Sequence, residues 1–204
     1  MRGLENFLKN PALQEQDLVV VHFSGHGHLF EDGRLYLLCN QTEASEIDIS
    51  AIEIDLIKRR LAECPARYKL LILDCCHAGS ATEGARGEQE VGEELNQVLQ
   101  GSSNVVLAAC SRTQTTRELT TIDGEDGGGV LSWIVRTACT TRLREVSGDD
   151  PLSLKDIQHW IPRIMQKINS GLSAEERLPQ PRTFYEELGG EEIWLTSIFS
   201  SWRL

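Results

Sequence analysis

Three short, uninterrupted runs of apolar residues stand out from the mixed pattern along the rest of the chain. They are Asp17–Phe23, Tyr68–Asp74 and Asn104–Cys110. Continuous apolar character is typical of strands that are covered on both faces of a sheet. A fourth apolar segment, Arg34–Cys39, follows the turn-forming pair Asp32-Gly33 and indicates a short hairpin arm. The pattern therefore predicts three buried strands and a hairpin between the first two.

A clear helical pattern lies between the first two strands, and only a weak one, around Glu90–Leu99, lies between the second and the third. Between the first two strands, apolar residues recur at spacings of three and four, namely at Ile54, Ile57, Leu61 and Cys64. The pattern Ser50-x-x-Glu53 predicts a capping box at the start of this helix, and Pro65 ends the helix.

Two further helices are predicted after the third strand. Residues Val130–Arg144 carry apolar side chains on one face of a helix. The pattern Ser153-x-x-Asp156 predicts a capping box for a second helix, whose apolar face continues over residues 157–168. Pro162 is expected to kink this helix or to mark the start of its second half.

The remaining segments are predicted to be loops, apart from one strand near the end of the chain. Thr113–Gly129, which ends in DGEDGGG, and Ser170–Arg182 have the polar composition of loops, and Ser80–Gly101 is polar and acidic. Ile193–Phe199 predicts a last strand at a sheet edge. Strands that alternate with helices predict an α/β three-layer sandwich with a mostly parallel sheet.

Composition narrows the classes of protein that the chain can represent. It has 204 residues, which favours one domain, and its net charge of −11 argues against nucleic-acid binding, which usually needs a basic face. No apolar run approaches the ~18 residues that a membrane span needs, and the start of the chain lacks the apolar segment of a signal peptide. Six cysteines are too few for a disulfide scaffold. We expect a cytoplasmic protein without a membrane or nucleic-acid partner.

Chemically active side chains follow the first two predicted strands. Residues 22–28 read HFSGHGH, and residues 74–80 read DCCHAGS. In open α/β sheets, active sites gather at the carboxyl ends of the strands, so the two segments are expected to face one another. A cysteine peptidase needs a thiol nucleophile, a histidine that transfers protons and N–H donors for the oxyanion. The two segments together supply all three.

Other chemistries fit these residues less well. A metal site could be drawn from His26, His28, Cys76 and His77, but their spacing matches no usual zinc motif. A Cys-x5-Arg phosphatase motif fails because Thr82 occupies the arginine position, and the G-x-S-x-G motif of serine hydrolases is absent. We therefore expect no metal and no cofactor.

The paired motifs HFSGHG and LLILDCCHAGS resemble those of caspase-like cysteine peptidases, in particular the metacaspase and bacterial caspase-like branch. The resemblance implies a caspase-like fold and makes His26 the catalytic histidine and Cys76 the nucleophile. It also implies that the N–H groups of Gly27 and Cys76 bind the oxyanion. The family usually has a strand and a helix before the histidine strand, where this chain has about sixteen residues. We interpret residues 1–204 as a single peptidase domain without that strand and helix.

The resemblance also implies a substrate class. Metacaspases carry a pocket acid two residues before the nucleophile and a pocket serine two residues before the histidine, which are Asp74 and Ser24 here. An acid in the pocket would pair with Arg or Lys before the scissile bond, the P1 position. Relatives cleave the segment after the nucleophile strand, where Arg86 is the only basic residue between Ser80 and Ser103. The implied partners are peptide substrates with a basic P1 residue and an activating partner or protease, and bacterial relatives act as proteolytic effectors in stress or phage defence.

Two alternatives to an active endopeptidase remain open at this point. The chain could be a non-catalytic scaffold or regulator with the same fold, or a metal- or redox-sensing module that uses the adjacent thiols Cys75 and Cys76.

Overall fold

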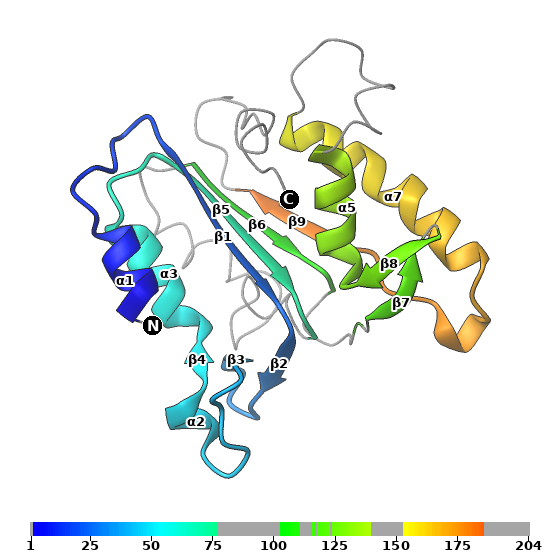
Figure 1. Cartoon of the computed structure of the whole chain (residues 1–204), viewed down its shortest axis with the longest axis horizontal. Helices are drawn as coiled ribbons and strands as arrows, with labels where there is room; N and C mark the ends of the chain where they lie inside the picture. Colours follow the sequence, from blue (N-terminus) through cyan, green and yellow to red (C-terminus); the bar gives the residue numbers. More distant parts are fainter. Residues whose placement is uncertain are drawn as a thin grey trace.

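A four-stranded sheet with the order β1-β5-β6-β9 forms the centre of the computed structural model, which describes residues 2–76, 103–110, 116, 118–122, 124–139 and 153–185 (Figure 1). Its strands are β1 (Leu18–Ser24), β5 (Tyr68–Asp74), β6 (Ser103–Ala108) and β9 (Arg182–Tyr185). The first three run parallel and β9 pairs antiparallel with β6. The three strands predicted from apolar runs are thus present, side by side and parallel.

Helices cover both faces of this sheet (Figure 1). α1 (Arg2–Leu8) and α3 (Ile54–Glu63) lie on one face, and α5 (Val130–Cys139) and α7 (Leu154–Ser170) lie on the other. β5 serves both cores, because successive side chains of a strand point to opposite faces. Leu70 and Ile72 are buried with α5 and α7, whereas Leu71 and Leu73 are buried with α3. This confirms the predicted α/β three-layer sandwich with a mostly parallel sheet.

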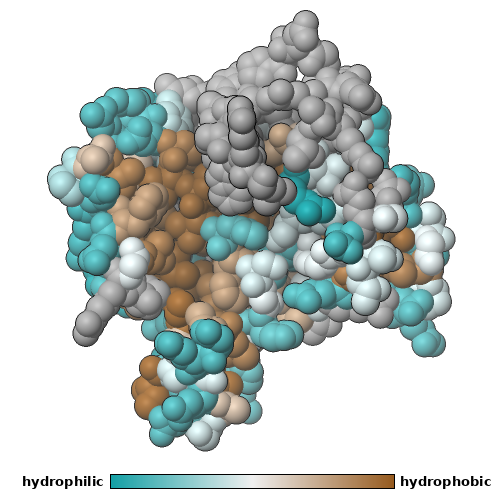
Figure 2. All heavy atoms as spheres, viewed as in Figure 1, coloured by the Kyte–Doolittle hydropathy of each residue, from teal (hydrophilic) through white to brown (hydrophobic). Residues whose placement is uncertain are grey.

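Among the described strands β1 lies at the edge of the four-stranded sheet, although its continuous apolar run is typical of a strand in the middle of a sheet. Within the described residues it pairs only with β5. Val19 is fully buried, whereas the other apolar side chains of β1 are partly buried, namely Leu18, Val20, Val21 and Phe23. Figure 2 shows apolar side chains gathered where this edge of the sheet lies. Side chains of β1 nevertheless pack on both cores, as the apolar run predicts, with Leu18 and Val20 on the α5–α7 side and Val19 on the α3 side.

Two small antiparallel sheets extend the structure beyond the central sheet. β2 (His26–Leu29), β3 (Leu35–Leu38) and β4 (Ile52–Glu53) form one of them. The predicted hairpin is confirmed: Gly33 adopts φ 87°, which favours glycine, and its N–H donates to the carbonyl of Phe30 at 2.9 Å. β7 (Leu119–Ile122) and β8 (Glu125–Gly128) form the other.

The helix starts agree with the predictions in one case and not in the other. Ser153 and Asp156 form the predicted reciprocal capping box of α7, and Pro162 lies inside that helix. Ser50 does not cap α3. It ends the short helix α2 (Ile47–Ser50), and its hydroxyl donates to the carbonyl of Glu46 at 2.6 Å. The two residues of β4, which pair with β3, separate Ser50 from α3, so the predicted capping box is wrong.

The predicted loops contain two elements that the sequence pattern did not indicate. The β7–β8 hairpin lies within Thr113–Gly129, and the short helix η2 (Ala174–Glu176) lies within Ser170–Arg182, where β9 also starts. The predicted strand Ile193–Phe199 lies outside the described residues. So do residues 140–144 of the helix predicted over Val130–Arg144, His77 and Arg86. None of the described helices is both long and apolar enough to cross a membrane.

Candidate active site

The carboxyl ends of β1 and β5 bring the two sequence motifs together. Ser24 is the register partner of Asp74, and the N–H of Gly25 donates to the carbonyl of Asp74 at 3.1 Å. His26 and Cys76 each follow this pair by two residues. The structure therefore places the predicted histidine and the predicted nucleophile on neighbouring segments at the same edge of the sheet, as parallel pairing requires.

Gly27 lets the histidine segment pack directly against the nucleophile segment. A Cβ atom at this position would lie 2.4 Å from the carbonyl oxygen of Cys76 and 3.2 Å from Sγ of Cys75. The first distance is too short for any side chain, because the contact is with backbone that cannot move aside cheaply, so glycine is needed for this approach. The backbone of Gly27 is accordingly beside that of Cys76, where the N–H groups of both residues were expected to bind an oxyanion.

The two adjacent cysteines differ in exposure and in environment. Cys75 is fully buried with the α3 side of the core, and burial raises the pKa of its thiol far above the ordinary value. Cys76 is only partly buried, and its thiol donates to the carbonyl of Thr116 at 3.1 Å. Because a nucleophilic thiol must be accessible and must lose its proton, Cys76 is the better nucleophile of the two.

His26 is exposed at the start of β2, where it pairs with Leu38. No hydrogen bond joins its imidazole to Cys76, both of which the structure describes. The thiol instead bonds to Thr116, and this bond must break before the proton can pass to His26. Catalytic hydrogen bonds are often long in structures without substrate and tighten only when substrate binds.

Asp74 is buried and caps helix α5. Its side chain is 3% exposed, and its Oδ2 accepts the N–H of Ser132 at 2.6 Å. Gly129 starts the helix, because its carbonyl accepts the N–H of Trp133, but it has no side chain to satisfy the free N–H groups of the first turn. A Cβ atom at Gly129 would lie 2.2 Å from Oδ2 of Asp74. The strand carboxylate thus takes the place of a capping side chain.

The electrostatic state of Asp74 follows from this burial. Desolvation raises the pKa of the carboxyl above its ordinary value, and the bonds from Ser132 and the nearby His22 act in the opposite direction. Its Oδ1 is buried without a hydrogen-bond partner. A buried carboxylate with one unbonded oxygen can accept a hydrogen bond from one more donor.

The sequence motifs included His22 without giving it a role, and Ser132 did not stand out at all. His22 and Ser24 lie on the side of the sheet that faces α5, because side chains two residues apart along a strand point to the same face. Nε2 of His22 lies 2.8 Å from Oγ of Ser132. Ser24 is exposed beyond His22 at the end of β1. The alternation of His22 and Ser24 was a usable signal, whereas only the fold brings Ser132 to them.

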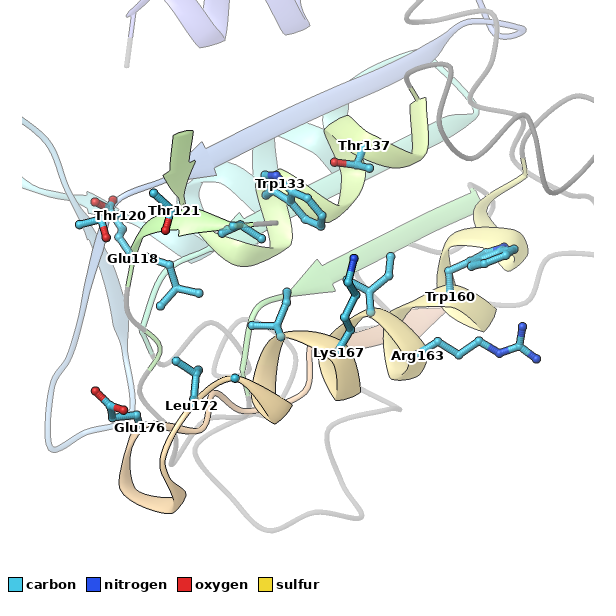
Figure 3. Close-up of a pocket in the computed structure, with 15 residues that line it drawn as sticks. Glu118, Thr120, Thr121, Trp133, Thr137, Trp160, Arg163, Lys167, Leu172 and Glu176 are labelled. Carbon is cyan, nitrogen blue, oxygen red and sulfur yellow. The ribbon is translucent and has the colours of Figure 1, made fainter. Parts of the chain in front are cut away.

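A cavity of about 790 Å³ lies between β7, α5, α7 and η2 (Figure 3). His26, Asp74 and Cys76 do not line it, but Trp133, which follows Ser132 in sequence, does. All residues from Glu118 to Ile122 line it, together with the rings of Trp133 and Trp160. In Figure 3, Lys167 extends from α7 toward α5. Among the described residues β7 pairs only with β8, so its other edge can offer backbone groups to a ligand. The volume is typical of ligand sites.

The described residues contain no cluster of three or more His, Cys, Asp or Glu side chains that could hold a metal ion. The arrangement of His26, Cys76 and Gly27 suits nucleophilic attack by a thiol, with backbone N–H groups close by.

Comparison with known proteins gives the family. The solved structure of protein GSU0716 from Geobacter sulfurreducens aligns with a TM-score of 0.44 and 13% sequence identity, over 90% of this chain and 70% of that one. No functionally curated protein matches the chain. The sequence model of the caspase domain, Peptidase_C14, matches residues 1–176. The chain therefore belongs to the caspase-domain family of cysteine peptidases.

Proposed function

We propose that the protein is a cysteine endopeptidase that cleaves after Arg or Lys and uses Cys76 and His26 as its catalytic dyad. The observation that carries the proposal is the parallel pairing of β1 and β5, which brings a partly exposed thiol beside an exposed histidine at one edge of the sheet. Membership of the caspase-domain family supports the same chemistry.

Peptide hydrolysis would proceed by acyl transfer. The Cys76 thiol gives its proton to His26, and the resulting thiolate attacks the scissile carbonyl carbon. The N–H groups of Gly27 and Cys76 stabilise the negative oxygen of the tetrahedral intermediate. Collapse of this tetrahedral intermediate breaks the scissile C–N bond, and His26 protonates the leaving amine. Water, deprotonated by His26, then attacks the thioester and releases the acid product and the free thiol.

Asp74 supports a basic residue at P1. Its unpartnered Oδ1 can accept a hydrogen bond from a guanidinium or ammonium group, and such charge-assisted bonds are stronger than neutral ones. A cation there would also counter the effect of burial, which raises the pKa of the carboxyl. Ser24, the register partner of Asp74, would line the mouth of this pocket.

The cavity next to β7 would hold the residues on the amino side of P1. The carbonyl of Thr116 accepts the Cys76 thiol, and only two residues separate Thr116 from the start of β7. An extended peptide that starts at Cys76 could therefore continue along the free edge of β7, since strand addition is a common mode of peptide recognition. Trp133 and Trp160 would contact its side chains.

Fluorogenic peptides test this function. We expect cleavage of substrates with Arg or Lys at P1 and none of matched Asp substrates. A peptidyl-Arg chloromethylketone should label wild-type protein once, at Cys76, and should leave Cys76→Ala unlabelled. Equal turnover of Asp substrates would contradict the pocket, and cleavage by Cys76→Ala would contradict the nucleophile.

A second candidate function is a non-catalytic scaffold or regulator. The bond from the Cys76 thiol to Thr116, in place of one to His26, favours it. Such a protein would react with iodoacetamide at Cys76 but would be neither labelled by the chloromethylketone nor active on any peptide.

The proposed enzyme would be a cytoplasmic effector in bacterial stress or phage defence, activated by a partner or by cleavage. Arg86, the only basic residue between Ser80 and Ser103, is the candidate cleavage site, cut by a second copy or by an upstream protease. Incubation at high protein concentration should give a fragment that ends at Arg86. The fragment should be absent from Arg86→Ala and, for self-cleavage, from Cys76→Ala. Full activity with an intact chain would show that this cleavage is not needed.

A further inference from the structure

The first turn of α5 contacts the proposed P1 pocket through Ser132. The backbone N–H of this residue donates to Oδ2 of Asp74 at 2.6 Å, and its side-chain Oγ lies 2.8 Å from Nε2 of His22. The three residues come from three different elements, namely β1, β5 and α5. Ser132 therefore connects the helix to both strands that carry the catalytic segments.

This contact decides which oxygen of Asp74 is free. The carboxylate can rotate about its last bond, and either oxygen can then face the helix. The Ser132 N–H holds Oδ2, which leaves Oδ1 as the oxygen without a partner. The bond between His22 and Ser132 ties the first helical turn to β1 and so limits the movement of that N–H.

His22 also lies within electrostatic reach of the same carboxylate. His22 keeps an exposed surface, but the protein around its ring removes part of its hydration, which lowers its pKa, and the charge of Asp74 opposes this effect without overcoming it. A histidine with a lowered pKa is neutral at neutral pH, so it can hydrogen-bond to Ser132 without competing as a cation for Asp74. The negative charge of Asp74 then remains available to a substrate.

We propose that His22 and Ser132 are positioning residues for the P1 pocket: together they hold Asp74 with Oδ2 on helix α5 and Oδ1 turned toward the substrate cation. The inference rests on the proposed preference for a basic P1 residue and adds the groups that orient its acid. Neither residue touches the reacting atoms, so their effect belongs to substrate selection.

Two matched substrates that carry arginine or citrulline at P1 measure this effect, because citrulline has the shape of arginine without its charge. Wild type should prefer arginine. In Ser132→Ala and His22→Ala this preference should fall about tenfold, mainly through a higher KM for the arginine substrate, which corresponds to a weakened charge-assisted bond. His22→Gln should recover most of the preference, since its amide can still bond to the Ser132 hydroxyl.

Controls separate positioning from a general structural effect. Ser50→Ala and His159→Ala remove the same groups at α2 and on the exposed face of α7, and should keep the wild-type preference. The rate at which iodoacetamide alkylates Cys76 should be equal in all variants. An unchanged preference in Ser132→Ala and His22→Ala, or an equal loss for both substrates, would overturn the inference.

A second measurement does not depend on activity. If the wild-type protein cleaves no peptide, the proposed function fails, but the pKa of His22 can still be followed by NMR. Asp74→Asn should lower this pKa, because it removes the negative charge that raises it. An unchanged His22 pKa would show that the two residues are not arranged as inferred.

Discussion

Cys75 and Cys76 are neighbours in sequence, but opposite sides of the strand end give them different surroundings. Cys75 is fully buried, with a strongly raised thiol pKa, and Cys76 is partly exposed. Cys76→Ala should lower peptide hydrolysis by more than about 10³-fold, because the nucleophile is lost. Cys75→Ala should keep most of the activity and lose about 1 kcal/mol of stability from the core. Initial rates and urea unfolding of both variants test this, and an inactive Cys75→Ala beside an active Cys76→Ala would reverse the assignment.

Because Asp74 is buried, its contribution to the stability of the folded protein should depend on pH in a predictable direction. Its pKa is raised in the folded protein, so the folded state holds this proton more tightly than the unfolded state does. Its contribution to stability is therefore largest below the ordinary pKa of aspartate and declines as pH rises through the folded value. Asp74→Asn can still accept the Ser132 N–H but carries no charge to bury.

We accordingly expect Asp74→Asn to be at least as stable as wild type at neutral pH, with an advantage that shrinks as pH falls below the folded pKa. The same change should remove most of the preference for Arg over citrulline at P1. Asp74→Ala, which also loses the acceptor, should cost about 1 kcal/mol relative to Asn at the same position. Thermal unfolding across pH decides the question, and a less stable Asn variant at neutral pH would contradict the sign of the shift.

At the scale of elements, the first turn of helix α5 is capped by Asp74, an acid on strand β5. Gly129→Ala would place a methyl group 2.2 Å from Oδ2 of Asp74 and would separate the carboxylate from the helix. The expected loss of stability is about 1–3 kcal/mol, as for other overpacked sites. Gly3→Ala in α1 is the matched control: nothing lies within 4 Å of its new Cβ atom, and the change should be neutral or stabilising by up to about 1 kcal/mol. Equal midpoints in urea for the two variants would argue against the capping role.

Elements whose signals are local could be predicted from the sequence. The three parallel strands have continuous apolar runs, and the start of α7 has a capping box whose two members bond to each other. The same capping pattern at Ser50 and Glu53 failed, because β4 uses the intervening residues to pair with β3. A local motif is overridden where a tertiary hydrogen bond needs the same backbone.

The β7–β8 hairpin shows a different limit. Its strands are short, and the glycines and acids of residues 124–129 have loop composition. Gly124 and Gly128 have the positive φ that favours glycine, at 81° and 127°. Close packing explains Gly127, since a Cβ atom there would lie within 2 Å of the carbonyl of Leu119. The same reason applies to Ser132 in the site: its contacts with His22 and Asp74 exist only after α5 has packed on the sheet.

The whole molecule combines these elements into a site that spans the sheet and the α5–α7 layer. The proposed catalytic segments follow β1 and β5, and the cavity that would hold the rest of the peptide is formed by β7, α5, α7 and η2. Substrates with a basic residue would also be attracted by the net charge of −11, because opposite charge steers association. Recognition in this protein would therefore depend on peptide length as well as on the P1 residue.

Trp160 tests that dependence. Its ring lines the cavity on α7, where Arg163 lies 5.7 Å from the ring centre, and it packs on the α5–α7 core, so the unfolding midpoint of each variant is measured beside its rates. A tetra- or hexapeptide that runs along β7 reaches this ring, whereas a dipeptide does not. Trp160→Ala should lower kcat/KM for the long peptides about tenfold, since burial of an aromatic side chain contributes 1.5 kcal/mol or more, on the order of a factor of ten. It should leave dipeptide cleavage unchanged. His159→Ala, the exposed neighbour, is the control. An equal effect of Trp160→Ala on long and short peptides would place the peptide outside the cavity.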